Sequence, residues 1–178
     1  TAVSALTAAA TAHTSALAPA SLAIAQVTTA TVLVTWDVGT NPAGTLFELQ
    51  SSTDNATFAG AGTTSAPPFS VAPLEAGATY FVRVRAANGD GVATAFSNTV
   101  STRTPLSLPT APGTPTGVAL TTGDVRWAWS ASTGATSYRI FLATETSSVL
   151  ATPTTSIFVL TGFAPNALSS VAVSGVNV

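Results

Sequence analysis

Residues 74–91 read LEAGATYFVRVRAANGDG, and this stretch decides the fold of the chain. Its apolar residues Tyr80, Val82, Val84 and Ala86 alternate with Phe81, Arg83 and Arg85. A period of two is typical of a β-strand that buries one face. The Asn88-Gly89-Asp90-Gly91 that follows favours a tight turn, because Asn and Gly tolerate positive φ. The stretch therefore predicts a half-buried strand, with both Arg on its exposed face, that runs into a turn.

Two shorter stretches upstream show the same alternation. Val32, Val34 and Trp36 form one apolar row, and Phe47 and Leu49 form another. Short alternating strands between turn signals predict an all-β chain built as a β-sandwich. We expect Trp36, Trp127 and Trp129 to lie in the core rather than on a sugar-binding surface, because each belongs to an alternating row.

The second half of the chain repeats this order of strands. Trp129 lies 93 residues after Trp36, and Val171 lies 89 residues after Val82. The other matching positions are Val125, Trp127, Tyr138, Ile140 and Val173. A period of about 90 residues is the size of a small domain and exceeds the 20–50 residues of solenoid units. The chain is therefore predicted to hold two similar modules.

Both halves resemble fibronectin type III modules. The resemblance rests on the strand-B residues Trp36 and Trp129, on the strand-C aromatics Phe47 and Tyr138, and on residues 74–84, which are similar to the tyrosine corner of that family. It covers nearly the whole chain and implies two immunoglobulin-like β-sandwiches. It implies little about function, because one fold hosts many functions.

The resemblance also implies where the modules begin and end. We expect a strand in residues 1–17 that resembles strand G of a preceding module, a complete module at 18–104, a stiff Pro-rich linker at 105–115 and a second module at 116–178. The second module is expected to lack strand G, because the sequence stops just past strand F. Ser169 also stands where the corner Tyr should be.

The N-terminal residues align with strand G of the first module. Val3 matches Val92 and, after a one-residue gap, Ala10 matches Val100 and Thr14 matches Thr104. The predicted donor residues are Val3, Leu6, Ala8, Ala10 and Ala12, and the predicted acceptor edge is Val171, Val173 and Val176. Ala- and Thr-rich segments align easily with one another, so a helix over residues 1–20 and a strand that folds back onto its own second module stay open.

An unpaired strand edge is a template for a strand from another chain. The sequence therefore predicts an extracellular or cell-surface structural subunit that polymerises head-to-tail with itself. The alternative is a two-module spacer or binding excerpt of a longer secreted or surface protein, such as an adhesin or an extracellular enzyme. Because Met is absent, Thr1 is expected to be a processed end or a fragment boundary.

Composition argues against other function classes. Only 7% of the residues are charged and the net charge is −2, which offers no field for nucleic acid or an anionic membrane. No apolar run reaches the roughly 18 residues of a membrane span. Cys is absent, so there are no disulfides and no thiol chemistry.

No constellation of residues predicts catalysis, a cofactor or a metal site. His13 is the only His and aligns with the exposed Arg103, so we expect a surface strand residue. Asp37, Asp54, Asp90 and Asp124 lie at predicted strand ends or turns, where Asp favours loop geometry. Asn88-Gly89-Asp90 occupies the position of the Arg-Gly-Asp adhesion motif of some family members, but Asn replaces Arg and favours a plain turn.

One modification site is predicted. Asn55-Ala56-Thr57 is an acceptor sequon between expected strands, which makes Asn55 a candidate glycosylation site and glycans candidate partners.

Overall fold

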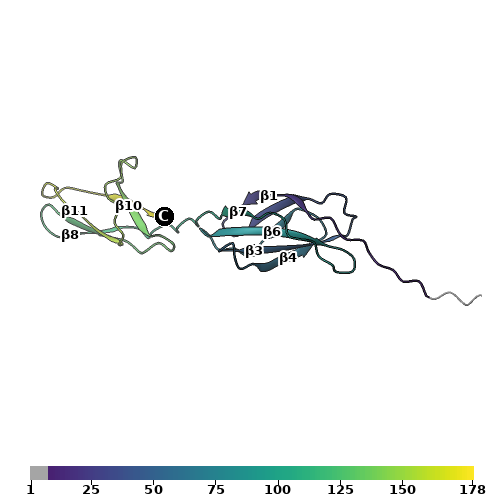
Figure 1. Cartoon of the computed structure of the whole chain (residues 1–178). Coiled ribbons are helices and arrows are strands. Elements are labelled where there is room, and N and C mark those ends of the chain that lie inside the picture. The colour runs from purple at the N-terminus through teal and green to yellow at the C-terminus, as the bar shows by residue number, and fades with distance from the viewer. Residues whose placement is uncertain (1–7) are drawn as a thin grey trace, which may run out of the picture. The chain divides into compact units, whose positions relative to one another are not determined.

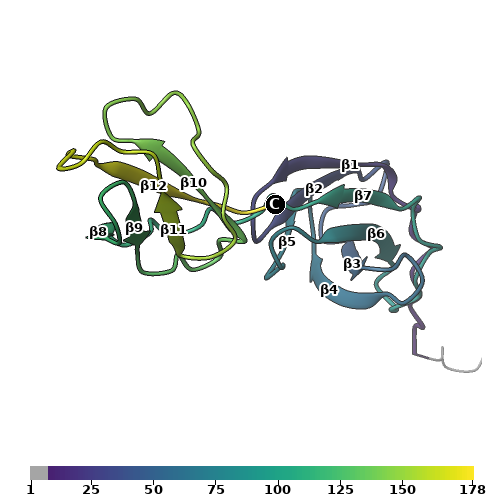
Figure 2. The same ribbon diagram turned by 90° about the vertical axis from the view of Figure 1, so that its left-hand side faces the viewer.

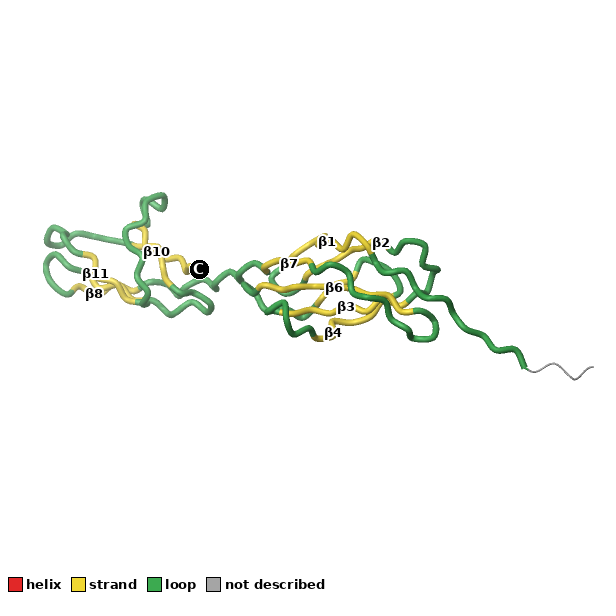
Figure 3. The backbone as a smooth tube through the Cα atoms, in the orientation of Figure 1, coloured by secondary structure: helices red, strands yellow, loops and turns green. Residues whose placement is uncertain are grey.

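The computed structural model describes residues 8–178, which form strands and loops without a helix (Figure 3). The chain divides after Pro105 into two compact units. We call them the first module, up to Pro105, and the second module, Leu106–Val178. The prediction of an all-β chain is confirmed.

The first module is a sandwich of two antiparallel sheets (Figure 1). One sheet has the order β1-β2-β5 and the other β4-β3-β6-β7. Their strands are β1 (Ala20–Val27), β2 (Val32–Asp37), β5 (Phe69–Val71), β4 (Ala59–Thr64), β3 (Leu46–Ser52), β6 (Thr79–Ala87) and β7 (Val100–Arg103). Figure 2 shows β3, β4 and β6 beside one another in the larger sheet.

The core of the first module consists of the inward rows of both sheets. Val34 on β2 and Val84 on β6 are completely buried, and the Trp36 ring lies 5.4 Å from the Phe47 ring. The other buried members are Val32, Leu49, Val71, Val82 and Ala86. The alternation read from residues 74–91 therefore places the core residues correctly.

The second module has the same strand arrangement with fewer strands. One sheet has the order β11-β9-β8, and the other contains β10 and β12. Their bounds are β8 (Thr116–Ala119), β9 (Val125–Ala128), β10 (Ser137–Leu142), β11 (Ile157–Leu160) and β12 (Val171–Val176). A single bridge between Ile140 and Ala151 stands where the first module has β4. Among the described residues, no strand takes the place of β7.

The core of the second module is smaller. It is formed by Trp127, Trp129, Tyr138, Ile140 and Val171. The rings of Trp129 and Tyr138 lie 5.3 Å apart, edge to face. Leu168, just before β12, is fully exposed. The prediction that all three Trp are core residues is confirmed.

The segments outside the sandwiches differ from the sequence predictions. Residues 8–19 form no strand in the single chain (Figure 3), and residues 1–7 of the predicted strand lie outside the described residues. The predicted Pro-rich linker is fastened to the second module, since Thr110 N donates to Thr133 O (3.0 Å) and Gly113 N to Ser130 O (3.2 Å). Two residues within the predicted stretch 105–115 are therefore held by loop carbonyls of the second module.

Candidate strand-docking interface

Strand β12 has one paired and one open edge. It pairs with β10 in a regular antiparallel register from Ser137–Val176 to Leu142–Val171. Within residues 8–178, nothing pairs with its other edge. The equivalent strand of the first module, β6, lies between β3 and β7. The second module therefore presents the edge that β7 covers in the first.

The open edge of β12 can be assigned residue by residue. Ser170 O accepts from Ala143 N (3.1 Å), and Val176 O accepts from Thr136 N (2.8 Å), so both residues face β10. In an antiparallel ladder, alternate residues direct their N–H and C=O to opposite sides. Val171, Val173 and Gly175 consequently direct their backbone groups to the open edge.

This assignment corrects one predicted acceptor residue. The apolar side chain of Val176 predicts that this residue belongs to the open edge, but the backbone groups of Val176 point toward β10. Gly175 directs its backbone groups to the open edge instead. The side chains of Val171 and Val173 point inward and pack in the core of the second module. A residue without a side chain gives no signal in an alternating apolar pattern, so sequence reasoning missed Gly175.

In the first module, hydrogen bonds hold the corner before β6 to the residue that follows β7. Glu75 N donates to the Tyr80 hydroxyl (2.9 Å). Thr104 is buried (1% exposed); its hydroxyl donates to Glu75 O (2.6 Å), and its amide donates to Ala78 O (2.9 Å). The residue that follows β7 therefore ties the corner to β6.

Among the described residues, the corner before β12 in the second module makes no corresponding hydrogen bonds. Ser169 stands at the position of Tyr80, as the sequence predicts. The one buried Tyr of this module, Tyr138, lies on β10, and its hydroxyl accepts from Ser132 N (3.0 Å) at a different turn. The corner before β12 is thus open on the side where strand G would pass.

The predicted donor residues that are described have no partner in the single chain. Ala8, Ala10 and Ala12 are exposed and lie in an extended segment, whereas Val3 and Leu6 lie outside the described residues. The backbone of residues 8–12 makes none of the described hydrogen bonds. Within the described residues, they are therefore not paired with any strand edge.

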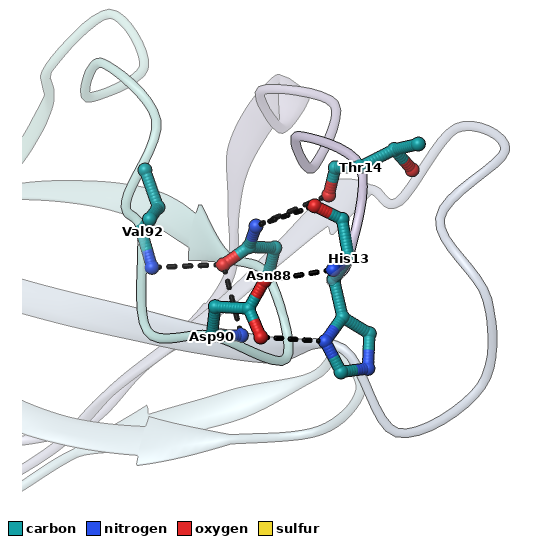
Figure 4. Close-up of polar contacts among 5 residues, drawn as sticks. All are labelled: His13, Thr14, Asn88, Asp90 and Val92. Atoms are coloured by element: carbon teal, nitrogen blue, oxygen red, sulfur yellow. Dashed lines mark hydrogen bonds and ion pairs between the residues drawn. The ribbon is translucent and has the colours of Figure 1, made fainter. Parts of the chain in front are cut away.

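Within the described residues, the N-terminal segment makes hydrogen bonds to the first module from His13 onward (Figure 4). His13 N donates to Asp90 Oδ2 (2.7 Å), and His13 Nδ1 lies 2.9 Å from Asp90 Oδ1. Asn88 Nδ2 donates to Thr14 O (3.1 Å). The hydrogen bonds from the His13 side chain and then its amide lower the pKa of Asp90. His13 is thus a contact residue with a specific partner, rather than the strand residue that the sequence predicts.

A second contact fixes the segment three residues later. Leu17 N donates to Asn41 Oδ1, and Asn41 Nδ2 donates to Leu17 O, both at 2.8 Å. Asn41 lies in the loop between β2 and β3, and Asn88 in the loop between β6 and β7. Residues 13–17, which we call the incoming segment, are therefore held across two loops at one end of the first sandwich.

The same pair of contacts recurs at the second module. Asn177 Nδ2 donates to Ser107 O (3.0 Å), and Thr110 bonds to the loop between β9 and β10 through Thr133. Ser107 lies 93 residues after Thr14, Thr110 lies 93 after Leu17, and Asn177 lies 89 after Asn88. These spacings equal those of the Trp and Val pairs. The incoming segment is therefore the counterpart of residues 106–110, which follow the last strand of a complete module.

Comparison with known families decides the identity of the first module. Residues 17–103 match the fibronectin type III domain. They form a fibronectin type III domain. Trp36, Phe47 and residues 74–84 are the features on which the sequence resemblance of this module was based, and the match confirms that resemblance.

Among solved structures, fibronectin type III domains also match this chain. A two-domain segment from chicken tenascin is 16% identical, with a TM-score of 0.49, and the match covers 90% of this chain and 91% of that one. A domain of human fibronectin type III domain containing protein 3 is 18% identical, with a TM-score of 0.47, over 56% of this chain and 94% of that one. No curated protein matches.

The Asn-Gly-Asp turn of the fibronectin type III domain binds the incoming segment. Asn88 Oδ1 accepts from Asp90 N (3.1 Å) and Val92 N (2.8 Å), which is the turn chemistry that the sequence predicts. Its amide nitrogen and the Asp90 carboxylate then bind residues 13 and 14 (Figure 4). Sequence reasoning missed this second role, although the Asn at equal spacing in both halves could have shown it.

The candidate glycosylation site lies on an exposed turn of the fibronectin type III domain. Asn55 is exposed and has a φ of 59°. The adjacent Asp54 carboxylate accepts from the amides of Ala56 and Thr57, both at 2.8 Å. The hydrogen bond from Ala56, then one from the Ser52 hydroxyl (2.7 Å), and then that from Thr57 lower the pKa of Asp54 to about 2. Glycosylation of Asn55 stays a prediction.

The remaining acidic residues form no cluster within the described part of the chain. Over residues 8–178, no three His, Asp or Glu side chains gather in a geometry that could hold a metal ion. The described part of the chain also has no helix that is long and apolar enough to span a membrane.

Proposed function

We propose that this chain is an extracellular or cell-surface structural subunit that polymerises by strand donation. The N-terminal strand of one copy, which lies within residues 1–14, adds to the open edge of β12 in the next copy and takes the place of strand G. The observation that carries the proposal is the contrast between β6, covered on both edges, and β12, covered on one.

Strand addition would satisfy both partners. The backbone groups of Val171, Val173 and Gly175 would gain a ladder, and each ladder hydrogen bond contributes about 0.5–1.5 kcal/mol net. The donor would bury small side chains beside the core that Val171 and Val173 already form. Part of this gain offsets the entropy lost when a free segment is ordered.

The geometry of the contact favours an open polymer. The donor lies before the first module and the acceptor lies in the second, so donor and acceptor surfaces differ. A heterologous contact of this kind continues from copy to copy unless a rotation closes a ring. A filament of head-to-tail copies is the expected product.

Electron microscopy and light scattering of the purified chain test this proposal. The matched control replaces residues 1–14 with a Gly/Ser segment of equal length, which keeps the chain length and removes the donor side chains. Filaments from the natural chain and monomers from the control are expected. Filaments from both chains would refute strand donation, and monomers from both would refute polymerisation.

The second candidate function is that of a two-module spacer or binding segment within a longer secreted or surface protein. The match of residues 17–103 to a family found in many cell-surface proteins favours it. The intact mass of the native protein discriminates the two, because a spacer segment predicts a much longer chain.

We further propose that the chain is not an enzyme, takes no cofactor, and neither binds nucleic acid nor inserts into a membrane. The low charge and the scattered acidic residues support this. Glycans at Asn55 are proposed as surface modifications that keep the sides of the subunit solvated. Digestion with a glycosidase, followed by mass measurement, tests that modification.

A further inference from the structure

We propose a specific register for the donated strand: residues 1–11 of one copy take the places that residues 94–104 occupy in the first module. This inference rests on the proposed strand donation and deepens it. It assigns Thr11 to the position of Thr104, and it reverses which face of the donor is buried.

The positions of Thr14 and Ser107, whose carbonyls are hydrogen-bonded, determine the register of the donated strand. Thr14 and Ser107 each have a backbone carbonyl bound by an Asn of the β6–β7 loop or its counterpart after β12. Ser107 lies three residues beyond Thr104, the residue that closes the corner of the first module. The residue at the same distance before Thr14 is Thr11. A connector of equal length therefore ends the strand at Thr11.

In this register, the Thr and Ser residues of the donor fall at the positions of the Thr and Ser residues that line the edge of β6 in the first module. In the first module, Thr94 Oγ1 accepts from Ala86 N and Ser97 Oγ from Val84 N, both at 3.1 Å. With the Thr104 hydroxyl, these side chains line the edge of β6. Residues 93 positions earlier are Thr1, Ser4 and Thr11, so a hydroxyl recurs at all three places without a gap.

The acceptor offers matching backbone groups. Val173 and Gly175 lie 89 residues after Val84 and Ala86 and direct their amides to the open edge. Ala164, at the same spacing from Glu75, would offer the carbonyl that Thr11 meets. The donor hydroxyls would thus repeat on β12 the contacts that the first module makes on β6.

The register decides which donor side chains face the core. On β7, Thr102 is half-buried and Ser101 and Arg103 are exposed, and the following Thr104 is buried. The corresponding inward residues of the donor are Ala9 and Thr11, and Ala8 and Ala10 face outward. The gapped sequence alignment instead places Ala8, Ala10 and Ala12 inward, because a shift of three residues exchanges the two faces of a strand.

The structure also argues against that gapped alignment. It gives Thr14 the position of Thr104, whose amide and hydroxyl both bind the corner of its own module. Thr14 is already held by Asn88 at the other end of a sandwich, at the place of Ser107. The gapped alignment would leave no connector between the two contacts.

Disulfide trapping tests the register in the full chain, which has no natural Cys. Ser101 pairs with Phe81 across β7 and β6, and their counterparts are Ala8 and Ser170. Ser170 faces β10 with its backbone, so this is a non-hydrogen-bonded pair with Cα atoms about 4.5 Å apart, within the range that a disulfide spans. The test chain carries A8C and S170C. The control chain carries T11C and S170C, the pair that the gapped alignment would join.

A covalent ladder of oligomers on a non-reducing gel is expected from the A8C/S170C chain, with no ladder from T11C/S170C. A ladder only from T11C/S170C would overturn the register and leave strand donation standing. Filaments without a ladder from either chain would also overturn it. A cross-linked monomer from A8C/S170C would support the register but refute donation between copies, and a chain that forms neither filaments nor cross-links would refute both.

Discussion

Single hydroxyl groups hold the corner of the first module together. Tyr80→Phe removes the acceptor of the Glu75 amide, 2.9 Å away, and leaves a half-buried donor without its partner. Loss of one such partner costs about 1–3 kcal/mol. We expect the free energy of opening of the first module to fall by that amount, measured by native-state hydrogen exchange of the β6 amides.

Tyr138→Phe is the matched control for this prediction. It removes the hydroxyl that accepts from Ser132 N in the second module. The exchange rates of β6 should then stay unchanged and those of β10 should rise. Equal effects of the two substitutions on β6 would show that the corner bond of Tyr80 has no special role.

The contact between His13 and Asp90 predicts a pH dependence at the start of the first module. The pKa of Asp90 is lowered from 3.8 by the hydrogen bonds from the side chain and amide of His13. Because the pKa of Asp90 is lower when His13 is bound to it, the ionised carboxylate stabilises this contact at pH values above the unperturbed pKa. The stabilisation is lost as pH falls through the lowered pKa. We therefore expect the His13 amide to be protected above pH 3.8 and to lose protection below it.

Nuclear magnetic resonance of the His13 amide during an acid titration measures this release. Asp90→Asn keeps the size of the side chain and removes its titration, so protection in that variant should not change over the same pH range. A variant that still shows the acid transition would contradict the role of Asp90.

Individual contacts were the least predictable part of the chain. The guanidinium of Arg83 lies 3.8 Å from the Phe58 ring centre and 4.1 Å from that of Phe96, although alternation indicates only that Arg83 faces outward. His13 and Asp90 likewise meet across 77 residues. Such pairs depend on how distant loops come together, which no local pattern contains.

Strands were predictable where one face is buried. The period of two in residues 79–87 identifies β6 and its core row, because a half-buried strand must alternate. The pattern is weaker near Ala151, where the structure has only one bridge to Ile140 in place of an edge strand. Edge positions bury little apolar surface, so the sequence carries little information about them.

Strand β12 contains a glycine whose neighbours leave no room for a side chain. A Cβ at Gly175 would lie 2.7 Å from Ser132 Oγ and 3.2 Å from both Ala135 Cβ and Pro109 Cβ. Gly175→Val should therefore destabilise the second module by about 1–3 kcal/mol, the usual cost of overpacking. Hydrogen exchange of the β10 amides measures the loss.

Gly60→Val is the control on an open site of β4. A Cβ at Gly60 would meet nothing within 4 Å, and the substitution adds the same atoms. Little change in stability is expected there. A second module that tolerates Gly175→Val as well as the first tolerates Gly60→Val would contradict the close packing described for β12.

At the scale of the whole molecule, the two modules share one strand plan, and within the described residues β12 is paired on one edge where β6 is paired on both. The sequence period of about 90 residues predicted two sandwiches. The sequence period could not show that the incoming segment and residues 106–110 make equivalent contacts. Their backbone carbonyls accept these hydrogen bonds, and a backbone carbonyl leaves no mark in the sequence. This equivalence links the uncovered edge to the residues that precede the first module.

The central claim is that the N-terminal strand, which lies within residues 1–11, pairs with the open edge of β12. The most direct test is hydrogen exchange of the Val171, Val173 and Gly175 amides in a chain that lacks residues 1–14, before and after addition of a synthetic peptide of that sequence. Strand donation predicts that the peptide slows the exchange of these three amides and that a scrambled peptide does not. Unchanged exchange at β12 in the presence of the natural peptide would contradict the claim.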